Sequence, residues 1–146
     1  MTTTAPGACL VSEGADPEVL EVHLLGAIDC DDVAQLVEEL EARSTARPYV
    51  LVDLRQVIEL TPAARTALVG LARSVARRSR RRAWLARSPR GRGLALWVLH
   101  VCPDPHAQVV GHPDAAVRWL HEDLTRTAAH EQGMRRYATQ RQRRAR

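Results

Sequence analysis

Histidine and cysteine side chains that could bind a metal gather late in the chain. His100, Cys102, His106 and His112 supply imidazole and thiol groups, which are the usual ligands of zinc and related ions. Two prolines interrupt this run, and no second cysteine or acidic residue follows at the spacing of a known metal motif. We therefore predict exposed loop histidines and a packed cysteine here, and no metal site.

The stretch Ser88-Pro89-Arg90-Gly91-Arg92-Gly93 has the residue types of an anion-binding loop. Gly91 and Gly93 allow a ligand to approach the backbone, and Arg90 and Arg92 could each hold an anion through two hydrogen bonds. The stretch lacks the third glycine of the dinucleotide fingerprint and the Lys-Ser/Thr ending of the Walker motif. We predict a turn that opens a helix, and we assign any anionic ligand to Arg90, Gly91, Arg92 and Gly93.

Thr61 could also meet an anion, because the free N–H groups at a helix start favour a phosphate. The pair Thr61-Pro62 is equally typical of an N-cap followed by proline at the first helical position. We interpret Thr61 as an N-cap, whose side-chain oxygen accepts a backbone N–H.

No set of residues predicts catalysis. Serine, histidine and aspartate do not occur in a supporting motif such as a nucleophile elbow. Asp29, Asp31 and Asp32 could hold magnesium, but the positive N-terminal end of a helix explains them equally well. The protein is therefore predicted not to be an enzyme, with no catalytic residues, no metal and no cofactor.

Alternating strands and helices are expected to position these residues. The apolar pattern predicts strands at residues 8–12, 19–25, 50–52, 83–86 and 109–110, and helices at residues 31–44, 62–82, 94–101 and 113–124. Asp53 is expected to end the third strand before a turn over residues 54–60. The arginines at residues 77–82 are interpreted as a solvated helix end, and Ala116, Val117 and Leu120 as inward-facing. This order predicts an α/β fold with a mainly parallel sheet of four to five strands and about four helices.

The charged residues are unevenly distributed along the chain. All 21 basic residues are arginine and the formal net charge is +4, with acidic residues concentrated in residues 1–59 and arginines in residues 60–146. We predict an α/β domain at residues 1–125 and an Arg-rich tail at residues 126–146, which is expected to be flexible, as frayed helix or disorder. The opposite charges of the two halves also allow a homo-oligomer.

Cysteine usage and hydropathy favour a cytoplasmic location. The three cysteines are widely spaced and contain no CxxC pair, so a disulfide framework is not indicated. The first residues lack the pattern of a signal peptide, and no apolar run approaches the roughly 18 residues of a membrane-spanning helix.

Three short motifs resemble the STAS domain when they are taken in order. They are Gly26-Ala27-Ile28-Asp29, then Val50-Leu51-Val52-Asp53-Leu54, then an apolar turn that ends at Leu60 before a helix. Residues 114–120 also look like the closing helix of that family, which includes anti-sigma-factor antagonists. The resemblance covers roughly residues 19–124 and implies the fold of these proteins.

The resemblance departs from the family at the start of the second long helix. In anti-sigma-factor antagonists this helix opens with Asp-Ser-Ser-Gly, and a kinase phosphorylates a serine there. Thr61-Pro62-Ala63-Ala64 occupies these positions, so the usual phosphorylatable serine is absent. Together with Ala83-Trp84-Leu85 and Ser88, this stretch is similar to a poorly characterised bacterial branch related both to STAS domains and to the lipid-binding CRAL-TRIO fold.

The resemblance implies a non-enzymatic regulatory module that binds a protein partner of a kinase-like or sigma-regulating kind. By position in the family, the partner is expected to dock on Glu59, Leu60, Thr61, Pro62 and Arg65. One alternative is a carrier of a small hydrophobic or anionic ligand, held in a pocket lined by Leu94, Trp97 and Val98. Another is an accessory protein that binds nucleic acid nonspecifically through its Arg-rich tail, although specific nucleic-acid binding is not indicated.

Overall fold

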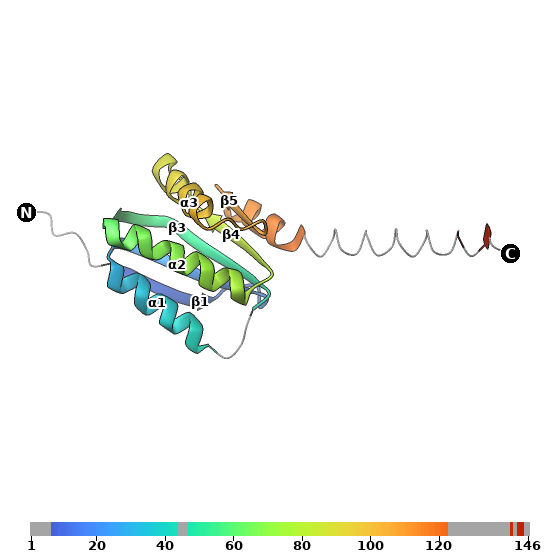
Figure 1. Cartoon of the computed structure of the whole chain (residues 1–146), viewed down its shortest axis with the longest axis horizontal. Coiled ribbons are helices and arrows are strands. Elements are labelled where there is room, and N and C mark those ends of the chain that lie inside the picture. The colour runs from blue at the N-terminus through green and yellow to red at the C-terminus, as the bar shows by residue number, and fades with distance from the viewer. Residues whose placement is uncertain (1–6, 44–46, 123–140, 142, 145–146) are drawn as a thin grey trace, which may run out of the picture.

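The computed structural model describes residues 7–43, 47–122, 141 and 143–144. Strands and helices alternate along it as β1 (Ala8–Glu13), β2 (Val19–Ile28), α1 (Cys30–Ala42), β3 (Tyr49–Leu60), α2 (Pro62–Arg78), β4 (Arg81–Leu85), α3 (Pro89–Val101) and β5 (Ala107–Val110). A helical segment at residues 113–122 follows (Figure 1). The predicted boundary at residue 125 and the predicted tail, apart from residues 141, 143 and 144, lie outside the described residues. Within those residues, no helix combines the length and the apolar character needed to cross a bilayer.

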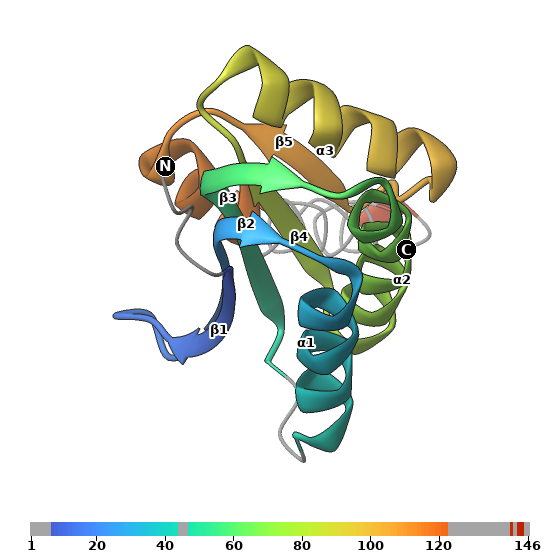
Figure 2. The same cartoon turned by 90° about the vertical axis from the view of Figure 1, so that its left-hand side faces the viewer.

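The five strands form one sheet in the order β1-β2-β3-β4-β5. β1 is antiparallel to β2, and the other three pairs are parallel. When successive right-handed crossovers each lead to the next strand in the same direction across a sheet, their helices lie on the same face of that sheet. Buried side chains of α1, α2 and α3 accordingly share one apolar core with β2, β3 and β4. Figure 2 shows α1 and α2 on one side of the sheet and the 113–122 helix on the other.

The 113–122 helix builds a second, smaller core on the opposite face. Ala116 and Leu120 are buried there against side chains from every parallel strand, namely Val19, Tyr49, Leu51, Ala83, Leu85 and Val110. Trp119 donates its indole N–H to the carbonyl oxygen of Arg82 at 2.9 Å, and His121 contacts Asp16 at 2.6 Å. The prediction that Val117 faces inward is wrong: its side chain is 51% exposed, because positions 116 and 120 already point at the sheet.

β3 is much longer than predicted, because Asp53 does not end it. Asp53 is only 4% exposed, and its carboxylate accepts hydrogen bonds from Nε and Nη2 of Arg55, two residues along the same face. The strand therefore continues through the predicted turn to Leu60. Its pairing with β4 stops at Asp53 and Leu85, whereas its pairing with β2 continues to Ile28 and Leu60. We call residues 54–60 the β3 extension; among the described strands, it pairs only with β2.

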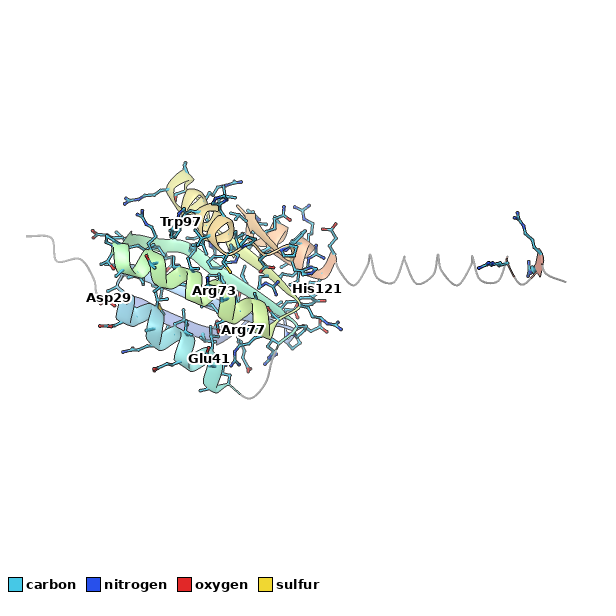
Figure 3. All side chains as sticks on the ribbon, in the orientation of Figure 1. Asp29, Glu41, Arg73, Arg77, Trp97 and His121 are labelled. Carbon is cyan, nitrogen blue, oxygen red and sulfur yellow. The ribbon has the colours of Figure 1, made fainter. Side chains whose placement is uncertain are left out.

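The arginines at residues 77–82 are not a single solvated helix end, as was predicted. Arg77, at the end of α2, is exposed and pairs with Glu41 of α1 at 3.5 Å, as Figure 3 shows. Arg81 and Arg82 instead begin β4 and are buried. The guanidinium of Arg82 binds Asp104 through two hydrogen bonds, and that of Arg81 lies 3.6 Å from the ring centroid of Trp119. These partners are distant in sequence, so a local charge pattern could not reveal them.

Removing one partner of the buried Arg82–Asp104 pair should destabilise the fold. We expect Arg82→Met to lower the free energy of unfolding by about 3–5 kcal/mol, because Asp104 then keeps a buried charge without its partner. The double variant Arg82→Met with Asp104→Leu should recover a large part of this loss. Urea unfolding followed by circular dichroism measures both effects.

The matched control is Arg77→Gln, which removes an exposed ion pair and should cost less than about 1 kcal/mol. Equal losses for Arg77→Gln and Arg82→Met would show that burial of the Arg82 pair contributes nothing to stability.

Candidate functional site

The carboxyl ends of β3 and β4 form the natural place for a site in this fold. In open α/β sheets, ligands commonly bind in the crevice beyond the carboxyl ends of the strands. α2 and α3 both begin at this end, immediately after β3 and β4 (Figure 1). Because β4 stops at Leu85 while β3 runs on to Leu60, the β3 extension has no neighbouring strand on that side within the described part of the chain. Figure 2 looks onto this end of the molecule, with α3 above the last residues of β3.

Side-chain oxygens cap both helices at this end. Thr61 Oγ1 accepts the N–H of Ala64 at 3.1 Å, and Pro62 is the first residue of α2, so the N-cap interpretation of Thr61 is confirmed. Ser88 Oγ accepts the N–H of Gly91 at 3.0 Å in the same way. The predicted turn at residues 89–93 is therefore the first turn of α3, and the helix begins five residues earlier than expected.

A pocket of about 490 Å³ opens between the β3 extension and the first half of α3. Its apolar wall comes from both elements and consists of Leu54, Val57, Ile58, Leu60, Leu94 and Trp97. Its polar lining consists of Glu59, Arg65, Ser88 and Arg90, with Gly91 and Gly93 between them. The side chains of Ile58 and Trp97 are 66% and 39% exposed, which leaves a large apolar surface open to solvent.

Two sites that the sequence suggested separately meet in this pocket. Glu59, Leu60 and Arg65, proposed for a partner, line it together with Arg90, Gly91 and Gly93, proposed for an anion. The remaining predicted residues, Thr61, Pro62 and Arg92, do not line it. Arg92 extends toward β5, where its Nη1 atom lies 3.3 Å from the position that a Cβ on Gly111 would take.

Two of the three residues expected to line a carrier pocket line this one. Leu94 and Trp97 line the pocket, whereas Val98 is fully buried in the main core. Sequence reasoning missed Leu54, Val57 and Ile58, because they were assigned to a turn. The signal that could have found them is weak: Leu54, Ile58 and Leu60 alternate with Arg55 and Glu59 at the period of a strand, but Gln56 and Val57 break the alternation.

The charged groups of the pocket have no partners among the described residues. Glu59, Arg65 and Arg90 are exposed, and none of them forms an ion pair or a side-chain hydrogen bond within that part of the chain. The backbone N–H groups of Gly91 and Arg92 are already bound to Ser88. An anion at this site would therefore depend on the two guanidinium groups rather than on a backbone loop.

The groups considered for a metal have other roles in the fold. Asp29 and Asp32 form a reciprocal capping box at the start of α1, with hydrogen bonds of 2.8 and 3.0 Å. His100 lies in the last turn of α3 and Cys102 is its C-cap. Across residues 7–43 and 47–122, the structure contains no group of three or more His, Cys, Asp or Glu side chains arranged to hold a metal ion.

A polar cluster lies on the face of the sheet that also carries the 113–122 helix. His23 Nδ1 lies 3.3 Å from Asp53 Oδ2 and its Nε2 lies 3.9 Å from Glu21, while Arg55 binds Asp53 at 2.9 Å. Burial raises the pKa of Asp53, but the hydrogen bonds from Arg55 outweigh this effect and hold the pKa below its ordinary value. The cluster therefore neutralises a buried carboxylate.

Comparison with known proteins identifies the fold. No family model matches the chain, and no curated protein sequence is similar enough to count as a relative. Several solved structures are similar in fold. An uncharacterized DUF3478-family protein with a SpoIIAA-like fold from Shewanella loihica is 16% identical and has a TM-score of 0.59, covering 82% of this chain and 97% of its own. An anti-sigma factor antagonist from Mycobacterium paratuberculosis is 19% identical, with 80% and 95% coverage and a TM-score of 0.58.

The third structure is the anti-sigma factor antagonist SpoIIAA in its unphosphorylated form, which is 13% identical, with 79% and 97% coverage and a TM-score of 0.55. The chain thus has the SpoIIAA-like, or STAS, fold. The resemblance and the α/β architecture predicted from the sequence are both confirmed.

The cap of α2 can be tested by a single substitution. We expect Thr61→Ala to lower the free energy of unfolding by about 1 kcal/mol, because the N–H of Ala64 loses its acceptor. Thr66→Ala, the same change within the exposed part of α2, should be neutral or slightly stabilising. Thermal unfolding of both variants measures these changes in stability. Equal losses for Thr61→Ala and Thr66→Ala would contradict the capping role of Thr61.

The Arg55–Asp53 pair should make stability depend on pH. Because the pKa of Asp53 is lowered, its contribution is present above the ordinary Asp pKa of about 4 and is lost as the pH falls through the folded-state value. We expect Arg55→Gln to cost about 1–2 kcal/mol at pH 7 and less at pH 3, because the contribution of the ionised Asp53 already shrinks below the ordinary Asp pKa of about 4. Urea unfolding at both pH values tests this, and a loss that does not shrink at pH 3 would contradict it.

Proposed function

We propose that this protein is a non-enzymatic regulatory module that binds a protein partner at the end of the sheet where α2 and α3 begin. The observation that carries the proposal is the exposed apolar pair Ile58 and Trp97 beside three charged side chains without partners among the described residues, Glu59, Arg65 and Arg90. Exposed apolar surface with a charged rim is typical of protein interfaces. We call this surface, made by residues 58–65 with Arg90 and Trp97, the docking surface.

The fold supports a regulatory role. Two of the similar structures are anti-sigma factor antagonists. In that family the partner docks at the start of the second long helix, which corresponds here to Glu59–Arg65. We infer that the partner is a regulatory protein of the kinase-like or sigma-regulating kind.

The start of α2 also suggests how this module differs from its relatives in fold. No serine occurs between residues 61 and 64, and the hydroxyl oxygen of Thr61 accepts a hydrogen bond from the backbone. We therefore propose that partner binding here does not depend on a phosphorylated serine at this position.

The pocket chemistry favours binding over catalysis. General acid–base catalysis uses a group that exchanges protons near neutral pH, most often histidine. The residues that line the pocket include no histidine and no cysteine, their one carboxylate, Glu59, is exposed, and the hydroxyl oxygen of Ser88 caps α3. Arginine stays protonated and is suited to holding a charged partner.

The docking surface predicts the effect of Ile58→Asp. A charge at this position should abolish partner binding, because it cannot be buried in an interface without a counter-ion. Affinity capture from the native lysate with quantitative mass spectrometry should show one protein that is enriched by the wild type and lost by Ile58→Asp.

The control is Leu10→Asp, which introduces the same charge at an exposed leucine on the edge strand β1. This variant should retain the partner. Retention of the same partner by both Ile58→Asp and the charge reversal Glu59→Arg with Arg65→Glu would overturn the docking surface.

A further inference from the structure

The pocket has the size of a small-molecule site. Its volume of about 490 Å³ lies within the range of roughly 300–1,000 Å³ that is typical of ligand pockets in proteins. It exists because the β3 extension passes the end of β4, so that α3 rather than a strand closes the space beside it. A protein interface alone does not need a pocket of this volume.

The interior of the pocket fits an apolar body. Leu54, Val57 and Leu60 face it from β3, and Leu94 and Trp97 face it from α3. Aliphatic and aromatic walls gain free energy when they cover apolar surface of a ligand. Figure 3 shows Trp97 on α3, the helix that closes this end of the molecule.

The rim of the pocket carries more positive than negative charge. Arg65 belongs to the first turns of α2 and Arg90 to the first turn of α3, and neither has an ion-pair partner within the described ranges. Glu59 is the one carboxylate among the lining residues, so the formal charge of the lining is +1. This balance matches a ligand with one negative charge better than a doubly charged phosphate.

The two helices that begin at the pocket carry no negative charge at their starts. The N-terminal end of a helix carries partial positive charge, which favours acidic residues and disfavours cations there. α1 follows this rule with Asp31 and Asp32, but α2 and α3 have no acidic residue in the first turn. A carboxylate between Arg65 and Arg90 would supply the negative charge that the starts of α2 and α3 both lack.

We propose that the pocket binds a small amphipathic monoanion, an apolar body that ends in one carboxylate. The apolar part lies between the β3 extension and α3, and the carboxylate lies between the guanidinium groups of Arg65 and Arg90. This inference goes beyond partner binding and does not depend on it, because the pocket is formed by this chain alone.

Decanoate is a suitable probe, tested by isothermal titration calorimetry on the full chain below its micelle concentration. We expect saturable binding of one decanoate per chain and at least tenfold weaker binding of decanol, which lacks the charge. Arg90→Gln should weaken decanoate binding about tenfold and leave decanol unchanged. Equal binding of decanoate and decanol, or tighter binding of decyl phosphate than of decanoate, would overturn the proposed monoanion.

Two glycines provide a matched pair of variants for the pocket. A Cβ at Gly93 or at Gly70 would meet no atom within 4 Å, and neither residue has a positive φ. A side chain can therefore start at either position without a clash at its Cβ, and leucine should favour the helix over glycine. Gly93→Leu, inside the pocket, should abolish decanoate binding, whereas Gly70→Leu on α2 should bind decanoate like the wild type.

The thermal unfolding midpoints of the two leucine variants show whether each is folded. Decanoate binding by a folded Gly93→Leu variant with wild-type affinity would place the ligand elsewhere and overturn the proposal. Absence of decanoate binding by the wild type at millimolar concentration would overturn it as well. Neither result bears on partner capture by the docking surface, so the two proposals fail separately.

Discussion

Each parallel connection in this sheet leads to the adjacent strand, always in the same direction across the sheet. The remaining architecture depends on that constraint. Because such crossovers are right-handed, α1, α2 and α3 must share one face of the sheet. The other face is left to the 113–122 helix, which is held through Trp119 and His121. The same constraint brings the starts of α2 and α3 together beside the end of β3, where the pocket forms.

The end of the molecule where α2 and α3 begin has an apolar wall and a positively charged rim, and each has a separate physical origin. The apolar wall arises from the unequal lengths of β3 and β4, since Ile58 and its neighbours lose the strand that would have covered them. The positive rim arises from the helix starts, where Arg65 and Arg90 face solvent without a carboxylate partner in the described structure. The proposed protein partner and the proposed small anion depend on these same two properties.

Local patterns in the sequence were sufficient for the order of elements and for Thr61, because periodicity and capping depend on neighbouring residues. They failed where a distant residue decides the outcome. Asp53 continues a strand because Arg55 neutralises it, and Arg82 is buried because Asp104, far along the chain, binds it. The pocket could not be predicted as one site, since the β3 extension and α3 come together only because β3 extends beyond the end of β4.

The β3 extension also presents a strand edge that no other described strand covers. Such edges are templates for pairing with another chain, and proteins usually protect them with charge or irregular geometry. Arg55 and Glu59 place opposite charges along this one, and the register of its partner β2 shifts twice, near Leu25 and Ala27. These irregularities increase the local twist of the strands. The exposed edge is therefore poorly matched to a flat, regular strand, which disfavours pairing with another chain. The pocket beside this edge can stay open to solvent without promoting aggregation.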